Sequence, residues 1–334
     1  MLITRTPLRI SLAGGGTDFR DFYKVENGMV ISATIDKYIY LVVNERYDDK
    51  IYLNYSKKEI VDSPAQIKHE LVREALNMTQ VEKGVEITCL ADIPSEQGSG
   101  LGSSSAFTVG LLNVLFQYNG KQLPADILAE KACMIEIERC RKHIGKQDQY
   151  AAAYGGINIF NFNKDESVAV ENIPLDDQAI EALDSRLLLF FTNIPRHGEA
   201  ILKEQEDNIA QRKKNDVLRK MRDQVAEIRK AIVSGDFDDV GRIINEGWQM
   251  KKHLAAPITN SEIDKMYLAA IDAGALGGKI CGAGGGGFLL LYIPLAKQDS
   301  VRAALKNYRE MPFRFEKQGS AIIFNMMGHP WKWG

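Results

Sequence analysis

Neither sign of charge dominates this sequence, and no long apolar run interrupts it. Its 42 lysine and arginine residues stand against 44 aspartate and glutamate residues, which gives a formal net charge of −2 at pH 7. Proteins that bind nucleic acid usually carry a basic excess or a basic stripe. The longest apolar stretch, around FLLLYI, is far shorter than the roughly 20 residues of a membrane-spanning helix. We therefore expect neither nucleic acid nor a membrane among its partners.

Cysteine is also scarce, and the chain starts without the marks of an export signal. The four cysteines, Cys89, Cys133, Cys140 and Cys281, are scattered and form no CxxC pair, which favours reduced and mostly buried thiols. The five histidines show no metal-ligand spacing. The first residues, MLITRTPLRISLAGGG, lack the apolar core of a signal peptide. These observations predict a cytoplasmic protein.

Two common nucleotide-binding signatures are missing as well. No phosphate loop of the form GxxxxGK[ST] occurs in the chain. The stretch GAGGGG at residues 282–287 formally satisfies GxGxxG, but the strand-like FLLLYI follows it. A dinucleotide-binding fingerprint requires a helix at that place, so the pattern argues against a dinucleotide-dependent oxidoreductase.

Strand-like and helix-like patterns are both present along the 334 residues, a length that fits one large domain or two ordinary ones. Residues 29–56 predict strands, with YDDK as the turn of a hairpin, and VEITCLADIP predicts another strand. Residues 196–254 predict charged helices broken at Asn215 and at SGDFD. A change of pattern at RLLLFFTNI places a domain boundary near residue 184, which divides the chain into residues 1–184 and 185–334.

The most informative stretch is SEQGSGLGSSSAFTVG at residues 95–110. Glycines let backbone N–H groups approach a ligand closely, and the N-terminus of the helix that follows adds about half a positive charge. Together they make an anion site suited to phosphates. Serine hydroxyls there can cap the helix, bind phosphate oxygens or ligate Mg²⁺. A capped helix after a flexible loop would show the same pattern, so this stretch alone leaves both interpretations open.

Three glycine-rich segments in this order resemble the GHMP kinases, a superfamily named for galactokinase, homoserine kinase, mevalonate kinase and phosphomevalonate kinase. PLRISLAGGGTD resembles its first motif, PSEQGSGLGSSSA its atypical phosphate loop, and KICGAGGGG its third motif. The first motif, with GKQDQYAAAYGG and FFTNIPRHGEAIL, is most similar to the sugar 1-kinases that act on D-glycero-D-manno-heptose 7-phosphate, relatives of the L-fucose kinases. The resemblance implies an α/β (α+β) fold with a ribosomal-protein-S5-like N-terminal domain and a ferredoxin-like C-terminal domain, and it implies an ATP- and Mg²⁺-dependent carbohydrate kinase.

The resemblance also implies the catalytic groups. Asp148 in GKQDQ corresponds to the carboxylate that accepts the alcohol proton, and Arg9 in PLRIS to the cation of the first motif. Phosphoryl transfer needs positioning, charge neutralisation and usually such a proton acceptor. An arginine beside Asp148 would keep it ionised and could stabilise an alkoxide forming between them. A capping loop aspartate and a surface arginine are the structural alternatives. The nucleotide phosphates are assigned to Gly98, Gly100, Leu101, Gly102, Ser103, Ser104 and Ser105.

Helix geometry distinguishes two candidate metal ligands. Glu136 and Glu138 stand two residues apart on the same predicted helix and therefore face different directions. Glu138 precedes Arg141 and Lys142 at helical spacing, which is typical of a solvated ion-pair face. Glu136 has Ala132, Cys133 and Cys140 around it, so we expect it to be buried, and a buried carboxylate needs a partner such as Mg²⁺. The resemblance also places a metal-binding glutamate twelve residues before the base, which is the spacing between Glu136 and Asp148. It implies Ser104 as the second ligand.

The acceptor is a small-molecule sugar phosphate by resemblance, bound by the first and third motifs. Galactokinases carry a Glu-His pair where this chain has Gly15 and Gly16; the glycines would widen the site for a phosphorylated sugar, although a tight turn explains them equally well. Asp18 would accept hydrogen bonds from sugar hydroxyls. Arg196 follows a strand and opens a helix, so it could hold a second phosphate. The residues assigned to the acceptor are Gly15, Gly16, Thr17, Asp18, Arg196, Gly284 and Gly285.

The resemblance thus implies transfer of the ATP γ-phosphate to the anomeric hydroxyl of heptose 7-phosphate, which would feed nucleotide-activated heptose to surface polysaccharide. A kinase of the same fold that acts on free L-fucose or a hexose stays open, as does a catalytically silent sugar sensor. The sequence does not decide whether the protein forms a homodimer.

Overall fold

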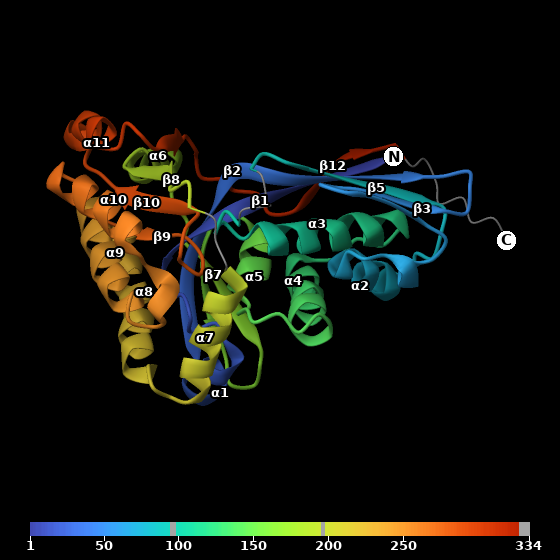
Figure 1. Ribbon diagram of the computed structural model, residues 1–334, viewed down its shortest axis with the longest axis horizontal. Helices are drawn as coiled ribbons and strands as arrows, with labels where there is room; N and C mark the ends of the chain where they lie inside the picture. Colours follow the sequence, from blue (N-terminus) through green and yellow to red (C-terminus); the bar gives the residue numbers. More distant parts are fainter. Residues whose placement is uncertain (94–97, 195–197, 327–334) are drawn as a thin grey trace.

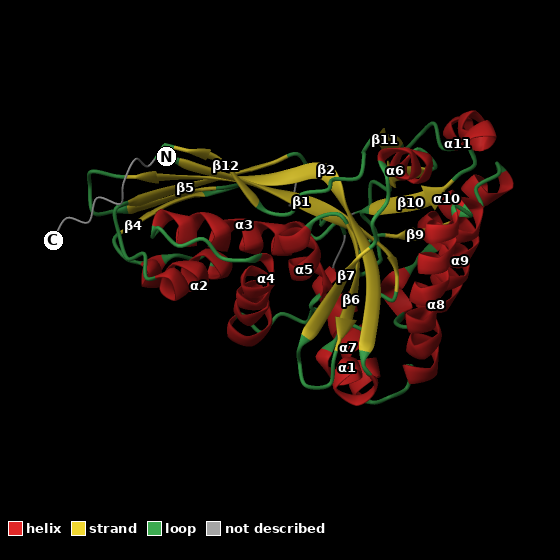
Figure 2. Ribbon diagram, turned by 180° about the vertical axis from the view of Figure 1, so that it is seen from behind, coloured by secondary structure: helices red, strands yellow, loops and turns green. Residues whose placement is uncertain are grey.

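Most of the first half of the chain forms one large, strongly bent sheet. The computed structural model describes residues 1–93, 98–194 and 198–326. Its larger sheet has eight strands in the order β12-β1-β2-β5-β3-β4, with β6 and β7 joined to the other part of β2. Figure 2 shows the two arms of the sheet diverging along β2, which pairs with β6 through Gly28–Ala33 and with β5 through Ile39–Glu45. The strands are β1 Leu2–Ala13, β2 Gly28–Glu45, β3 Ile51–Asn54, β4 Lys58–Val61, β5 Val85–Ala91, β6 Ile157–Phe162, β7 Val168–Asn172 and β12 Ala321–Asn325.

Helices cover one face of this sheet, and the central one follows the glycine- and serine-rich loop (Figure 1). Helix α3 packs against β1 and β2 on one side and against α2, α4 and α5 on the other. Its sequence is apolar nearly all round, as expected of a fully buried helix. The core therefore fixes the position of the α3 N-terminus. The helices of this half are α1 Arg20–Glu26, α2 Glu70–Thr79, α3 Ser103–Tyr118, α4 Ala125–Cys133, α5 Gln147–Tyr154 and α6 Asp177–Asp184, with a short 3₁₀ turn at Pro64–Gln66.

The second half is built on a smaller, four-stranded antiparallel sheet with the order β11-β8-β10-β9. Along the chain its elements run strand, helices, strand, strand, helix, strand, which is the ferredoxin-like arrangement. Its strands are β8 Leu187–Phe191, β9 Gly277–Ile280, β10 Phe288–Tyr292 and β11 Arg309–Met311. Its helices are α7 Gly198–Ala210, α8 Asn215–Ser234, α9 Phe237–Lys251, α10 Ser261–Asp272 and α11 Gln298–Ala304, with short turns at Ala256–Ile258 and Leu295–Lys297.

The smaller sheet is buried on both faces, which explains its continuous apolar strands. Leu187 and Leu189 of β8 belong to the core cluster of the large sheet, whereas Leu188 and Phe190 pack among α7 to α10. The two halves therefore share a core. The expected fold class, an α/β (α+β) fold with a ferredoxin-like second half, is confirmed. The described residues include no helix that is long and apolar enough to cross a membrane.

One expectation about strand pairing was wrong. The predicted YDDK hairpin does not form, because β5 lies between β2 and β3 and pairs with both of them. Turn residues specify a reversal of the chain but not the strand beside which it settles. In addition, β12 near the end of the chain pairs with Leu2–Arg5 of β1 in the large sheet. The boundary at residue 184 falls between α6 and β8. The division of the chain into residues 1–184 and 185–334 stays a prediction, because β12 belongs to the second segment in sequence but pairs with β1 in the large sheet.

Candidate active site

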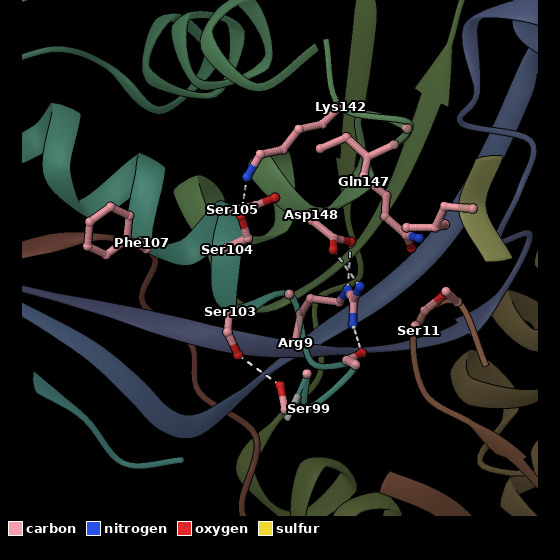
Figure 3. Close-up of a pocket in the computed structure, with 18 of the residues that line it drawn as sticks. Arg9, Ser11, Ser99, Ser103, Ser104, Ser105, Phe107, Lys142, Gln147 and Asp148 are labelled. Atoms are coloured by element: carbon pink, nitrogen blue, oxygen red, sulfur yellow. Dashed lines mark hydrogen bonds and ion pairs between the residues drawn. The ribbon is translucent and has the colours of Figure 1, made fainter. Parts of the chain in front are cut away.

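A single cavity of about 890 Å³ reaches from the glycine- and serine-rich loop to the smaller sheet. Its lining comes from both halves of the protein, including β1, the start of α3, α5, α7, α9 and β9. We call the part around the loop and α3 the donor side. We call the part around residues 11–19 and β9 the acceptor side. Figure 3 shows the side chains where the two sides meet.

The loop presents an open helix N-terminus to the donor side. Gly98, Gly100 and Gly102 all have positive φ angles, of 67°, 80° and 78°, which side chains disfavour. Gly102 is the N-cap residue of α3, and no side chain caps this helix, so its first N–H groups stay available for an anion. Ser99 braces the loop, because its hydroxyl lies 2.8 Å from that of Ser103 and accepts a 3.2 Å bond from the Leu101 N–H. The simple capped-helix interpretation is therefore wrong.

Arg9 and Asp148 form a bidentate pair between β1 and α5. Arg9 donates from Nε to Oδ1 at 2.8 Å and from Nη2 to Oδ2 at 2.6 Å. Its Nη1 donates to the Gly100 carbonyl at 2.6 Å. The arginine is only 4% exposed, whereas the aspartate side chain is 24% exposed toward the cavity. Such fork-to-fork pairs fix orientation as well as charge, so Asp148 is held against the phosphate loop.

Glu136 is completely buried and is surrounded by neutral hydrogen-bond donors. Ser104 and Ser105 donate their hydroxyls to its two oxygens at 2.8 and 2.7 Å, and Gln149 donates its amide at 2.6 Å. No lysine, arginine or histidine of the described chain forms an ion pair with it, so its charge has no cationic partner there. Glu138 is exposed, as the helix-face argument predicts. The backbone between them is a π-helical turn at Met134–Arg139, a feature that is frequent at functional sites.

These oxygen atoms fit a magnesium ion. A carboxylate and a hydroxyl are the hard ligands that Mg²⁺ prefers, and it binds through one or two protein groups while it keeps several waters. Among the described residues, no cluster of three or more His, Cys, Asp or Glu side chains could hold a metal ion.

Lys142 also reaches the donor side, a contact that the sequence did not predict. Its Nζ donates to the Ser104 hydroxyl at 3.2 Å and lies 3.7 Å from Glu70 Oε1 (Figure 3). The spacing along the chain had paired it with Glu138. The helix ends before Lys142, where Arg141 has a φ of 51°, so helical spacing no longer applies and the lysine turns back over the serines.

Beyond the serines, the donor side continues as an apolar compartment with flat aromatic walls. The His69 ring lies 5.1 Å from the Phe107 ring and meets Tyr55 edge-on at 5.0 Å. Burial and the nearby charge of Lys142 lower the pKa of His69, which favours the neutral ring. Ile39 and Leu90 complete the wall. The shape suits a planar heterocyclic base, and no motif in the sequence indicated it.

On the acceptor side, Asp18 is 3% exposed and lines the cavity. It accepts hydrogen bonds from the backbone N–H groups of Gly16 and Gln147 at 3.0 and 3.2 Å. Burial, and secondarily the charge of Asp148, raise its pKa to about 6. Asp18 therefore faces the cavity as a buried carboxylate that ionises less readily than an exposed aspartate.

Gly15 and Gly16 of the first motif are glycines for different structural reasons. A Cβ on Gly16 would lie 2.6 Å from Gln205 Nε2, and its φ of +99° already disfavours a side chain. Gly15 has no such constraint, since its nearest contacts would be Ser11 Oγ at 3.7 Å and Gln147 Nε2 at 4.0 Å. The tight turn therefore explains Gly16, whereas Gly15 leaves space in the acceptor side.

Several predicted residues do not reach the cavity. The Thr17 hydroxyl is buried in bonds to the Gly14 and Met29 backbone. Leu101 is fully buried, and its carbonyl accepts a hydrogen bond from the Arg9 N–H. Gly284 and Gly285 turn toward Ile258 instead, and Gly285 donates its N–H to the Ile258 carbonyl. The structure thus places Thr17, Leu101, Gly284 and Gly285 behind the lining of the cavity, where their contacts support the loops that form it, and their predicted binding roles stay predictions. Arg196 lies outside the described residues.

Comparison with known proteins agrees with this geometry. Residues 54–156 match the GHMP kinases N terminal domain, and residues 228–310 match the GHMP kinases C terminal domain. A D-glycero-alpha-D-manno-heptose 7-phosphate kinase from Campylobacter jejuni is 31% identical over 330 residues, which cover 95% of this chain and 97% of that protein. A galactokinase from Pyrococcus furiosus is 24% identical, with 91% of this chain and 92% of that protein covered.

A solved structure is also similar throughout its length. The crystal structure of a D-glycero-D-manno-heptose 1-phosphate kinase from Bacteroides thetaiotaomicron superposes with a TM-score of 0.80 and 26% sequence identity, over 96% of this chain and 98% of that one. With both domain models and a full-length relative matched, the chain belongs to the GHMP kinases.

Proposed function

We propose that the protein is an ATP-dependent sugar 1-kinase that phosphorylates the anomeric hydroxyl of D-glycero-D-manno-heptose 7-phosphate. The observation that carries the proposal is the placement of the Arg9–Asp148 pair at 2.6 and 2.8 Å, directly beside the open N-terminus of α3 and in one cavity with the acceptor side. Both the curated relative and the solved structure quoted above are named for a heptose phosphate.

ATP would occupy the donor side. The aromatic compartment at His69 and Phe107 accepts the base, and the backbone N–H groups that start α3 bind the phosphates. Lys142, next to Ser104, adds a positive charge for the phosphate oxygens. These groups neutralise and position the triphosphate, which is most of what catalysis of phosphoryl transfer requires.

Glu136 and Ser104 are the residues that would hold Mg²⁺. When bound, the ion neutralises charge on the phosphates. Ser105 and Gln149 keep the carboxylate of Glu136 oriented through their hydrogen bonds to it. The buried carboxylate without a cationic partner supports this assignment.

The transfer itself would depend on Asp148. Its carboxylate accepts the proton of the anomeric hydroxyl while the sugar oxygen forms a bond to the γ-phosphorus and the bond from that phosphorus to the bridging oxygen of ADP breaks. Arg9 holds the carboxylate in place and stabilises the oxygen anion that develops beside it. Asp18 orients the sugar by accepting its hydroxyls, and Gly15 leaves space for a sugar larger than a hexose.

The product would be a heptose bisphosphate on the way to a nucleotide-activated heptose for surface polysaccharide, made in the cytoplasm. Cys89, Cys133 and Cys140 are free thiols, as expected in a reducing compartment.

The test is ADP release with a panel of acceptors, followed by ³¹P NMR of the product. We expect heptose 7-phosphate to give the highest kcat/KM, above the unphosphorylated heptose, L-fucose and galactose, with the new phosphate on the anomeric carbon. Preference for fucose or galactose would identify a free-sugar kinase instead. No ADP release with any sugar would leave the sensor as the better interpretation.

A further inference from the structure

The acceptor side contains a buried cation that the proposed mechanism does not use. Lys279 on β9 lines the cavity and is 5% exposed. Among the described residues, Lys279 makes one long hydrogen bond, from Nζ to the Leu12 carbonyl at 3.5 Å, and no described carboxylate lies within ion-pair distance. A buried ammonium without a charged partner is costly. Burial lowers its pKa to about 8, with the Arg9 charge acting in the same direction, so it still carries a proton at neutral pH.

A second buried polar group lies on β1, next to the residue that Lys279 contacts. Ser11 is 6% exposed and lines the cavity, and its hydroxyl has no hydrogen-bond partner in the described part of the protein (Figure 3). Arg9 and Ser11 are two residues apart in β1 and therefore lie on the same face of the strand, about 6.6 Å apart along it. Leu12, the residue after Ser11, supplies the carbonyl that Lys279 contacts. The Lys279 ammonium therefore contacts β1 at the residue after Ser11, two to three residues along the strand from Arg9.

Another buried lysine shows what a structural role looks like. Lys251 on α9 also lines the cavity, but its Nζ donates to the Ile280 carbonyl at 3.2 Å and to the Gly282 carbonyl. Its ammonium holds together the glycine-rich turn after β9. Lys279 has no comparable set of bonds.

We propose that Lys279 and Ser11 form the subsite that binds the phosphate already present on the acceptor sugar. The inference rests on the proposed function, since it assumes that the anomeric hydroxyl lies at Asp148. A sugar placed so extends along β1, and its far phosphate then meets an ammonium that lacks a charged partner and a hydroxyl that lacks a hydrogen-bond partner among the described residues. The ligand class is a sugar phosphomonoester. The sequence had assigned this role to Arg196, on a different segment.

The first test compares Lys279→Met with the wild type on heptose 7-phosphate and on the same heptose without phosphate. Loss of a charge-assisted bond should raise KM for the phosphorylated sugar about 10- to 100-fold, while kcat/KM for the free sugar changes less than about twofold. The melting temperature should stay the same or rise, because methionine removes a buried charge. Lys251→Met is the matched control: it should lower the melting temperature and reduce activity on both sugars alike.

The proposal is wrong if Lys279→Met impairs both sugars equally or lowers the melting temperature, since Lys279 would then be a structural tie between the sheets. Ser11→Ala should show the same selectivity with a smaller increase in KM, and it serves as the readout if Lys279→Met does not fold. Failure of the proposed function is visible in the wild type alone, as absence of turnover with heptose 7-phosphate.

A second test does not depend on turnover. Calorimetry with inorganic phosphate as the probe, with the nucleotide site filled by a non-hydrolysable ATP analogue, should detect binding to the wild type and none to Lys279→Met. Equal binding to both proteins would overturn the subsite whatever the sugar proves to be.

Discussion

The donor and acceptor sides of the cavity differ in how far their polar groups satisfy one another. On the donor side, Arg9 is bonded to Asp148, and Glu136 is bonded to Ser104 and Ser105. On the acceptor side, Asp18 accepts hydrogen bonds from backbone N–H groups, Lys279 makes one long hydrogen bond to a carbonyl, and the Ser11 hydroxyl has no partner among the described residues. The donor side is therefore organised before its ligand arrives, whereas the acceptor side is completed by its ligand. We infer that the donor side supplies the groups that catalyse the transfer and that the acceptor side determines which sugar binds.

The largest effect is expected when the proton acceptor on the donor side, Asp148, is replaced. Asp148→Asn keeps the size of the side chain but removes the proton acceptor, so kcat should fall about 10²- to 10⁴-fold. The KM for ATP should change little. Steady-state ADP release measures both values. A variant that turns over within a few-fold of the wild type would show that another group takes the proton.

The second prediction concerns the metal ligand and uses the neighbour on the other helix face as its control. Glu136→Gln should raise the Mg²⁺ concentration needed for half-maximal activity about 10- to 100-fold. Glu138→Gln, which changes an exposed side chain, should leave the Mg²⁺ dependence unchanged. Equal or reversed effects in a Mg²⁺ titration of ADP release would reject Glu136 as the ligand.

The third prediction separates backbone strain from disturbance of the Arg9–Asp148 pair. Gly102 and Gly120 have φ angles of +78° and +71°, but a Cβ on Gly102 would lie 3.2 Å from Arg9 Cγ and 3.4 Å from Asp148 Oδ2, whereas Gly120 has nothing within 4 Å. Both alanine variants should lose roughly 1–2 kcal/mol of stability. Only Gly102→Ala should also lower kcat, by about tenfold or more. Denaturant unfolding and ADP release test the pair, and a similar kcat in both variants contradicts the account.

The smallest effect is expected from the buried carboxylate of Asp18 on the acceptor side. The pKa of Asp18 is about 6 in the folded protein against 3.8 when unperturbed. A raised acid pKa means that the folded state holds the proton more tightly, so ionised Asp18 destabilises the fold increasingly from about pH 4 to pH 6. The full cost above pH 6 is at most about 3 kcal/mol.

Asp18→Asn carries no such charge. Its melting temperature relative to the wild type should therefore shift upward by about 5 °C between pH 4 and pH 7.5. Scanning calorimetry at the two pH values measures the difference. A gap that does not change with pH would mean that Asp18 is not a strained, ligand-awaiting carboxylate.

How much of the site the sequence could predict follows the same division. The donor side was accessible because its groups lie within motifs: the glycines and serines adjoin α3, and the helix-face argument separated Glu136 from Glu138. Lys142 was missed because the helix ends before it. Lys279 and Ser11 were missed because they are 268 positions apart, as 279 less 11 gives, and nothing local reveals that the two sheets bring them together.

The fold shows a similar limit. The breaks at Asn215 and SGDFD were predicted, since helix ends depend on local residues. The insertion of β5 between β2 and β3, and the return of β12 to β1, depend on which buried faces meet. Those choices are made by tertiary packing, which a single sequence does not display.

The most direct test of the account is a crystal structure with a non-hydrolysable ATP analogue and heptose 7-phosphate bound together. We predict the terminal phosphate of the analogue between the first turn of α3 and Asp148, with the anomeric oxygen of the sugar within hydrogen-bond distance of that carboxylate. Nucleotide density away from the loop at residues 98–105, or an Asp148 side chain turned away from the terminal phosphate, would contradict it.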